Sequence, residues 1–500
     1  MQSSEVGCRV ARHISVAMAV FALLQDAAAA AREAPNDEAA APSALDQTVP
    51  SLPDVLRQFT DPGGLRSKLE RAGLQLTFTY YGDAFGNPSG GVTQGLGYDG
   101  RFGTIIDADL EKLAGWSGAS FHASIHQIHG TQFSAVNLQN LATVSGIEAP
   151  LSTRLFNLWI EQKIGDEINV RLGQFSAAQE FLVSQNASLF VNSTFGWPAL
   201  PAQDLPSGGP AYPEATPAAR LTWTPTDHLT VLAAIFNGDP AGPGADNPVL
   251  RDPYGLAFRV NDPPLLIAEL AYAYNQPRSI AQENPHQEGA GPRTSQQPVT
   301  VPAAIGGLPG TVKLGAWLHT GQFADERFDS QGGLLAVSGG PPLRHSGNFA
   351  VYGMIDQMLW RAAGGSSERE LSFFLRALGA PDDRNLIDFY LDTGLTYKGL
   401  VASRPDDTIG LGAAYGRVSP LAAANDRDVM AITGVATPIR DYEATIELTY
   451  QMQLEKNWLI QPNLQYIVHP GGHVPNPRDP SGTAAIANAL VLGARTILKF

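Results

Sequence analysis

Charged and aromatic side chains recur singly along the chain, at positions whose neighbours are apolar. The residues best suited to chemistry are Arg171, Arg220, Arg376, Glu161, Glu269, Asp109, Glu180, Trp159 and Trp317. Guanidinium and carboxylate groups exchange hydrogen bonds with polar solutes, and an aromatic ring covers the less polar face of a solute. Facing a water-filled space, such groups would form shallow sites that release a solute readily.

Two other groupings suggest a metal site or catalysis, and neither interpretation is favoured. His122, His126 and His129 share one segment, but His122 and His126 would lie about 13 Å apart on a strand with ~3.3 Å per residue. Ligands of one ion lie only ~2 Å from it. Asp382 and Asp383 are adjacent on a turn, and adjacent residues rarely place two carboxylates across a glycosidic bond. The sequence therefore predicts no metal, no cofactor and no enzymatic activity.

The polar candidates lie on segments that alternate apolar and polar residues. Residues 156–161, 265–274 and 445–452 each follow this period-two pattern, with Trp159, Glu161, Glu269 and Glu447 on the polar side. Such alternation predicts β-strands with one apolar and one polar face. Packed sheets of a soluble sandwich show the same pattern, so alternation alone does not identify a membrane protein.

The amino terminus predicts export. Arg9 and Arg12 precede an apolar run over residues 14–24, and small residues follow at 27–31. At about a dozen residues the run is too short to cross a bilayer as a helix, which needs roughly 20. Residues 1–31 are therefore predicted to be a cleaved signal peptide. The sole cysteine, Cys8, lies within it, so the mature chain would contain no thiol.

Two further segments precede the strands. Residues 32–60 are rich in Ala, Pro and acidic residues and are predicted to form a mobile periplasmic linker. Asp61 can cap a short amphipathic helix that has Pro62 at its first position and ends at Gly73. Residues 61–500 are then predicted to form one all-β domain.

Composition and length narrow the class of this domain. No later segment has 18 uninterrupted apolar residues, and the formal charge of −15 argues against nucleic-acid binding. At about 25 to 30 residues per strand and connection, the chain provides about 16 strands, an even number as in bacterial outer-membrane barrels. Phe500 ends an alternating strand that would close the barrel. The barrel-assembly machinery would recognise this C-terminal strand. The expected long connections are 198–217, 238–253, 277–309 and 421–434.

Several sequence blocks resemble one family. The blocks are GLRSKLERAG at 64–73, VRLGQF at 170–175, ARLTWTP at 219–225, AIFNGDP at 234–240, FLR at 374–376 with PDDRN at 381–385, IELTYQ at 446–451 and QPNLQYIVHPG at 461–471. In this order they resemble the OprB-type carbohydrate-selective porins. Arg171, Arg220 and Arg376 lie within these blocks.

The resemblance implies a transmembrane antiparallel β-barrel of 16 strands in the outer membrane of a Gram-negative bacterium. It implies facilitated diffusion of monosaccharides through a water-filled lumen with a charged and aromatic constriction, and a monomer rather than a trimer. The nine residues named first are the predicted constriction. Two alternatives stay open at this stage: an outer-membrane channel for amino or aromatic acids, and a secreted soluble β-rich glycosidase.

Overall fold

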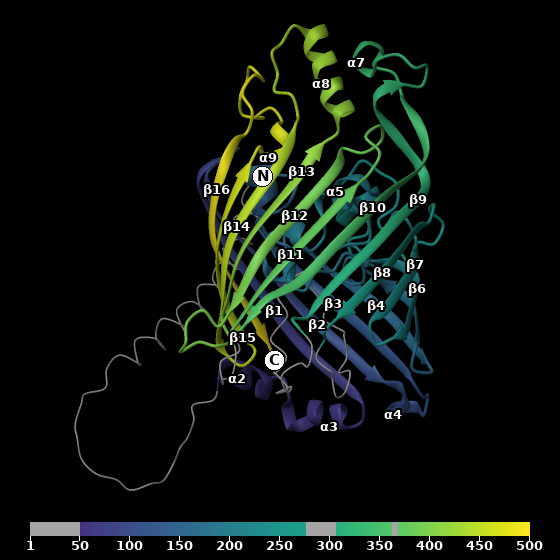
Figure 1. Ribbon diagram of the computed structural model, residues 1–500, viewed down its shortest axis with the longest axis vertical. Coiled ribbons are helices and arrows are strands. Elements are labelled where there is room, and N and C mark those ends of the chain that lie inside the picture. Colours follow the sequence, from purple (N-terminus) through teal and green to yellow (C-terminus); the bar gives the residue numbers. More distant parts are fainter. Residues whose placement is uncertain (1–50, 277–306, 363–368) are drawn as a thin grey trace, which may run out of the picture. The chain divides into compact units, whose positions relative to one another are not determined.

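Sixteen antiparallel strands of the described chain form a closed barrel in the computed structural model (Figure 1). The structure describes residues 51–276, 307–362 and 369–500, so the predicted signal peptide, most of the linker and most of the 277–309 connection lie outside the described residues. Each strand pairs with its neighbours in sequence, and β1 pairs with β16. The prediction of an antiparallel barrel of about 16 strands is confirmed.

The first eight strands are β1 (Leu74–Gly91), β2 (Gly95–Asp109), β3 (Ala119–Gly130), β4 (Ser152–Ile164), β5 (Ile168–Phe175), β6 (Thr216–Thr226), β7 (Leu229–Phe236) and β8 (Leu265–Tyr274). The other eight are β9 (Gly310–Asp329), β10 (Pro342–Arg361), β11 (Glu370–Gly379), β12 (Ile387–Lys398), β13 (Thr408–Val418), β14 (Tyr442–Glu455), β15 (Trp458–Val468) and β16 (Ala487–Lys499). We call the end where β1 begins and β16 ends the terminal end, and the opposite end the loop end.

The two faces of the strands follow the predicted alternation. On β14, Leu448 points outward and is 43% exposed, whereas Glu447 points inward and is fully buried. On β16, Leu492 points outward and Arg495 inward, where Arg495 pairs with Asp83 of β1 across the closing seam. An apolar outer face with polar side chains inside is the arrangement that a membrane barrel needs and a soluble sandwich reverses.

Aromatic side chains gather on the outer surface near the terminal end. The exposed rings are those of Trp223, Tyr272 and Trp360, each within the last four residues of β6, β8 and β10, respectively. Tryptophan and tyrosine are favoured at membrane interfaces because their rings combine an apolar body with a polar group. None of the helices in the described part of the chain is both long and apolar enough to span a bilayer.

Short helices lie in the connections at the two ends of the barrel and in the connections that fold into it. The α-helices are α2 (Leu52–Phe59), α3 (Leu65–Arg71), α4 (Leu110–Ala114), α5 (Ala199–Asp204), α6 (Pro248–Arg251), α7 (Leu335–Ser338), α8 (Pro420–Thr433) and α9 (Pro470–His473). The single helical turns are η1 (Pro62–Gly64), η2 (Ser134–Leu138), η3 (Ala177–Gln179), η4 (Ala187–Leu189), η5 (Ser193–Phe195) and η6 (Pro206–Gly208).

Two of these helices differ from the sequence prediction. Residues 52–59, assigned to the linker, form α2, whose N-cap Ser51 accepts a hydrogen bond from the Asp54 amide. Residues 421–434, expected to be a long connection, are largely the helix α8, capped by Ser419. The predicted helix after Asp61 is the η1 turn followed by α3, because Gly63 and Gly64 adopt left-handed backbone angles.

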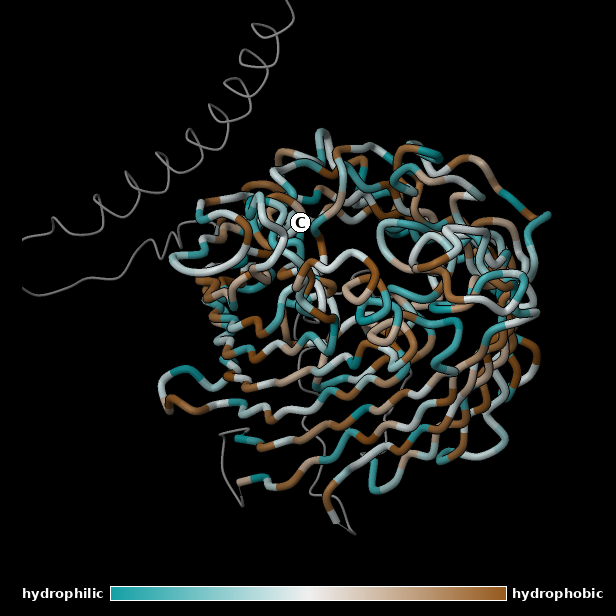
Figure 2. Tube along the Cα trace, turned by 90° about the horizontal axis from the view of Figure 1, so that it is seen from above, coloured by the Kyte–Doolittle hydropathy of each residue, from teal (hydrophilic) through white to brown (hydrophobic). Residues whose placement is uncertain are grey.

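Two loop-end connections fold into the barrel, and segments within the ring are visible from above (Figure 2). The connection 176–215 contributes Phe181, Phe190 and Phe195 to an apolar core that also contains inward side chains such as Phe374 of β11 and Tyr390 of β12. The connection 131–151 packs against β1, β15 and β16 in a similar way. The lumen is therefore partly filled by packed chain and is not lined by polar side chains alone.

Candidate functional site

Four of the predicted residues form one ion cluster on the inner wall of β4, β5 and β6. Arg171 Nε donates to Glu161 Oε2 at 3.0 Å, and Arg220 Nη2 donates to the same oxygen at 2.7 Å. Glu180, on the connection after β5, pairs with Arg171 Nη1 and lies 3.1 Å from Arg220 Nε. We call these four residues the charge cluster. Its two positive and two negative groups neutralise one another.

Strand register explains why this cluster forms. Arg171 lies opposite Glu161 on one side and opposite Arg220 on the other. Cross-strand neighbours on one face lie within about 5.5 Å at Cβ, so two arginines there would repel without shared carboxylates. The two glutamate side chains are 14% and 11% exposed and the two arginine side chains 7% and 6%, so the carboxylates reach furthest toward water.

Trp159 supports the charge cluster from the neighbouring strand position. The Arg171 guanidinium lies 3.8 Å above the Trp159 ring centre, a cation–π contact. The His122 ring stacks on Trp159 with centres 4.8 Å apart, and Asp107 lies 2.6 Å from His122 Nδ1. Because β3 and β5 flank β4, His122 and Arg171 cover opposite faces of the indole. Trp159 therefore orients Arg171 and has neither face free for a solute.

Arg376 has a different environment from the charge cluster. It is fully buried and makes a bidentate ion pair with Asp392 of β12. Its remaining N–H groups donate to the carbonyl oxygens of Leu182 at 2.6 Å and of Thr194 at 3.0 Å and Phe195 at 3.2 Å. Arg376 therefore fastens the connection 176–215 to the wall and is buried away from a passing solute.

Glu269 holds the same connection from the other side. Its carboxylate accepts the Leu182 amide at 3.0 Å and the Tyr352 hydroxyl at 2.9 Å, and it pairs with Lys313 at 3.1 Å. Leu182 is fully buried and has a left-handed backbone with φ of 60°, unusual for a residue with a side chain. Its amide is held by β8 and its carbonyl by β11, so Leu182 forms a strut across the inside of the barrel.

The other two predicted residues lie elsewhere. Asp109 ends β2 at the terminal end, where it caps α4 by accepting the Lys112 amide at 3.1 Å. Its side chain is 41% exposed, and it belongs to a turn and not to the inner wall. Trp317 is 2% exposed and packs in the apolar core around the connection 176–215. The structure does not bring either residue to the charge cluster.

A model of the carbohydrate-selective porin, OprB family, matches residues 93–500. The chain belongs to this OprB family. Porin B of Pseudomonas aeruginosa is 25% identical over 458 residues, which is 87% of this chain and 89% of that protein. The putative porin QuiX of Acinetobacter baylyi is 22% identical, over 82% of this chain and 88% of that protein.

A solved structure agrees with the fold. The high-pH structure of Pseudomonas putida OprB has a TM-score of 0.72 and 24% identity, and the match covers 88% of this chain and 97% of that one. This OprB-family chain is an outer-membrane porin for carbohydrates, as the resemblance predicted. The family and the barrel fold indicate a channel rather than an enzyme.

Sequence reasoning missed the anchoring role of a set of inward carboxylates, which hold the two inserted connections of this porin. Glu447 accepts the amides of Val191 at 2.7 Å and Asn192 at 2.9 Å. Glu443 accepts the amides of Leu141, Ala142 and Gly471, and Asp356 accepts the Asn186 amide and the Ser184 hydroxyl. Their positions on the polar strand faces were a usable signal, but their partners on the inserted connections lie 170 to 302 residues away in the sequence.

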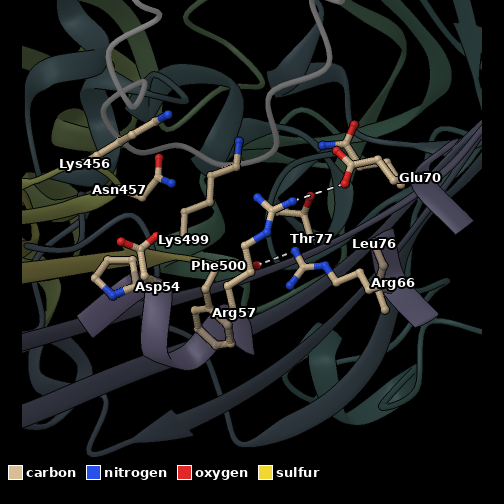
Figure 3. Close-up of a pocket in the computed structure, with 12 residues that line it drawn as sticks. Asp54, Arg57, Arg66, Glu70, Leu76, Thr77, Lys456, Asn457, Lys499 and Phe500 are labelled. Carbon is tan, nitrogen blue, oxygen red and sulfur yellow. Dashed lines mark hydrogen bonds and ion pairs between the residues drawn. The ribbon is translucent and has the colours of Figure 1, made fainter. Parts of the chain in front are cut away.

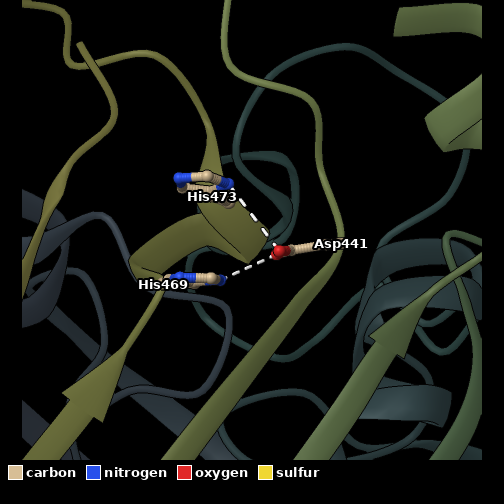
Figure 4. Close-up of side chains that lie close together, drawn as sticks. All are labelled: Asp441, His469 and His473. Atoms are coloured by element: carbon tan, nitrogen blue, oxygen red, sulfur yellow. Dashed lines mark hydrogen bonds and ion pairs between the residues drawn. The ribbon is translucent and has the colours of Figure 1, made fainter.

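One further group of polar side chains lies at the loop end of the porin (Figure 4). Asp441, His469 and His473 have potential ligand atoms within 4.8 Å of one another. Asp441 Oδ1 lies 2.8 Å from His469 Nδ1, and the two imidazoles stack with centres 4.2 Å apart and planes 13° from parallel. Two nearly parallel rings cannot both direct a nitrogen lone pair at one ion, so metal binding would require a ring to rotate. The arrangement is a carboxylate held beside two histidines.

Proposed function

We propose that this porin passes monosaccharides and that the charge cluster is part of its narrowest section. The observation that carries the proposal is the neutral arrangement of Arg171, Arg220, Glu161 and Glu180 on the inner wall, with the carboxylates more exposed than the guanidinium groups. Paired charges have no net attraction for ions, yet each group retains edges that can accept or donate hydrogen bonds.

A sugar suits such a wall. Its ring presents hydroxyl groups that both donate and accept hydrogen bonds, so it can contact a carboxylate and a guanidinium in one position. Each contact exchanges a hydrogen bond with water for one with the wall, and the net gain is therefore only about 1 kcal/mol. Shallow binding of this kind allows entry and release, which facilitated diffusion requires.

The inserted connection sets the position of the cluster. Glu180 belongs to the connection 176–215, which reaches the strands β5 and β6 through Glu180 and the strands β8 and β11 through Leu182. Glu180 is only two residues from Leu182, which is bound on both sides, so the Glu180 carboxylate has little freedom to move. Glu180 is therefore as fixed within the constriction as a residue on a strand.

Planar-bilayer recording tests this function. The wild-type porin should give single-channel steps whose current falls as glucose is added. A variant with Glu161→Gln and Glu180→Gln keeps the size of both side chains but leaves two unbalanced arginines, so the glucose concentration for half-block should change several-fold and the current should favour anions.

A matched variant provides the control. Asp109→Asn removes one carboxylate at the terminal end, outside the charge cluster, and should leave glucose block unchanged. Block by amino acids or aromatic acids without block by glucose would support a different cargo and contradict the proposal. Equal effects of the two variants would show that the charge cluster does not contact the sugar.

We further propose that the porin acts as a monomer and that strand β16 is the segment the barrel-assembly machinery recognises. Support for the first point is the apolar outer face, which continues from Leu172 through Leu314 and Leu411 to Leu492. Support for the second is that β16 closes the barrel against β1. Light scattering in detergent tests the first point, and the yield of folded porin after Phe500→Ser tests the second.

A further inference from the structure

A cavity of about 150 Å³ lies at the terminal end, between α2, α3 and the closing strands (Figure 3). Its lining includes the basic side chains of Arg57, Arg66, Lys456 and Lys499, against the acidic side chains of Asp54 and Glu70. We call it the basic pocket. A cavity of ~150 Å³ accepts a molecule as large as benzene, so a phosphate group fits.

The cations of the basic pocket are not equivalent. Arg57 pairs with Glu70 at 3.1 Å, and Arg66 donates to the Phe500 carbonyl at 2.8 Å, so both have protein partners. Lys456 and Lys499 carry no dashed line to the other lining residues in Figure 3, and among the described residues neither has an ion-pair partner. Two unpaired ammonium groups on one cavity favour an anion.

The pocket borders a group of aromatic rings at the end of the barrel. The Arg66 guanidinium lies 5.4 Å from the centre of the Phe78 ring. Phe78 in turn contacts the rings of Phe102 and Phe500, all three on the outer face of the barrel. Trp458 follows the Lys456–Asn457 turn directly and also points outward. The basic pocket therefore borders the lipid-facing surface at Phe500, and Lys499 enters the pocket from the inward side of β16.

The helices beside the pocket expose an apolar surface of their own. Residues 52, 55, 56 and 59 of α2 share one helical face by their i, i+3, i+4 and i+7 spacing. Phe59 is 84% exposed, and Val55 and the α3 residue Leu65 are also exposed. Short amphipathic helices with basic neighbours are typical of segments that lie in the headgroup region of a bilayer.

We propose that the basic pocket binds the phosphate of a phospholipid in the periplasmic leaflet, with Lys456 and Lys499 contacting the phosphate. The exposed residues Val55, Phe59 and Leu65 contact the apolar part of the same lipid layer. Charge complementarity favours a phosphate, and the exposed apolar surface beside the pocket favours a lipid phosphate over a soluble one. The terminal end faces the periplasm because porin barrels place their long loops outside.

Native mass spectrometry of the purified full-length porin tests this site. The porin is titrated with dioctanoyl phosphatidylglycerol, and binding to the wild type is compared with binding to Lys456→Ala/Lys499→Ala. Losing two lysine contacts should weaken binding about 30-fold, from about 1 kcal/mol for each lysine near a lipid phosphate. The conservative variant Lys456→Arg/Lys499→Arg should bind like the wild type.

The control is Lys112→Ala/Lys163→Ala, which removes two lysines from the same end of the barrel but outside the pocket. Phe59→Ser should weaken binding of the lipid and leave binding of inorganic phosphate unchanged. Equal loss in the two lysine pairs would overturn the proposal. Displacement of the lipid by equimolar inorganic phosphate, or by a peptide of the acidic residues 32–50, would also overturn it in favour of that occupant.

Discussion

The buried pair of Arg376 and Asp392 gives the most direct test of how the inserted connection is held. Replacing Arg376 by Leu removes the bidentate ion pair and the hydrogen bonds to the carbonyls of Leu182, Thr194 and Phe195. Asp392 is fully buried, so its charge would be left with no cation beside it and only the Tyr390 hydroxyl donating to it at 2.9 Å. Breaking a buried ion pair in this way costs about 3–5 kcal/mol of folding free energy.

Urea unfolding of the porin in lipid vesicles, followed by tryptophan fluorescence, measures this loss. Arg361→Leu is the matched control, because Arg361 pairs with Glu370 near the terminal end and both side chains are partly exposed. Exposed pairs contribute about 0–1 kcal/mol. The double variant Arg376→Leu/Asp392→Asn should recover part of the loss, since it removes the unpaired charge.

The same variants should differ in conductance. With Arg376 replaced, the carbonyl side of the Leu182 strut is free while the amide side stays on Glu269, so the connection can move within the lumen. We expect a noisier single-channel current and weaker glucose block for Arg376→Leu only. If Arg376→Leu and Arg361→Leu lose the same stability and show the same current, the assigned role of Arg376 is wrong.

Three other predictions concern charge and pH. Arg220→Gln leaves two carboxylates with one arginine in the charge cluster, so reversal potentials in a KCl gradient should shift toward cation preference. Burial raises the pKa of Glu148, on the connection 131–151, to about 7, so the folded state holds a proton that the unfolded state releases near its ordinary value. The contribution of Glu148 to the free energy of unfolding is full below pH ~4.5 and falls as pH rises to about 7. Glu148→Gln should therefore remove this pH dependence from the free energy of unfolding. The Ala484 amide and other hydrogen bonds lower the pKa of Asp479 to about 2, so its contribution is present above its ordinary pKa and lost as pH falls toward 2. Asp479→Ala should therefore increase protease cleavage of residues 475–485 at neutral pH.

The sequence predicts those parts of the porin that depend on local pattern. Alternation sets which side chain faces inward, so the directions of Glu447, Leu448 and Leu492 follow directly. Three members of the charge cluster are also predictable, because β4, β5 and β6 are neighbours in the barrel and their register brings Arg171 beside Glu161 and Arg220. Glu180 joins them from the connection 176–215, which strand register does not predict.

The remaining roles depend on contacts between distant segments. Arg376 and Glu269 also point inward, but their function is decided by a connection that lies between β5 and β6 and docks on β8 and β11. Nothing in the alternation of either strand indicates that contact. The structure places Asp109 outside the charge cluster for a local reason. A carboxylate at the end of a strand can cap the following helix, and this competes with an inward orientation.

The docking of the connection 176–215 has a consequence for biogenesis. This segment leaves the ribosome before β8 to β14, which carry most of its anchoring groups, and its aromatic side chains would have no completed surface to join. The apolar core around the connection 176–215 can therefore form only once those strands are in place. A chaperone that covers these aromatic side chains before then would aid maturation.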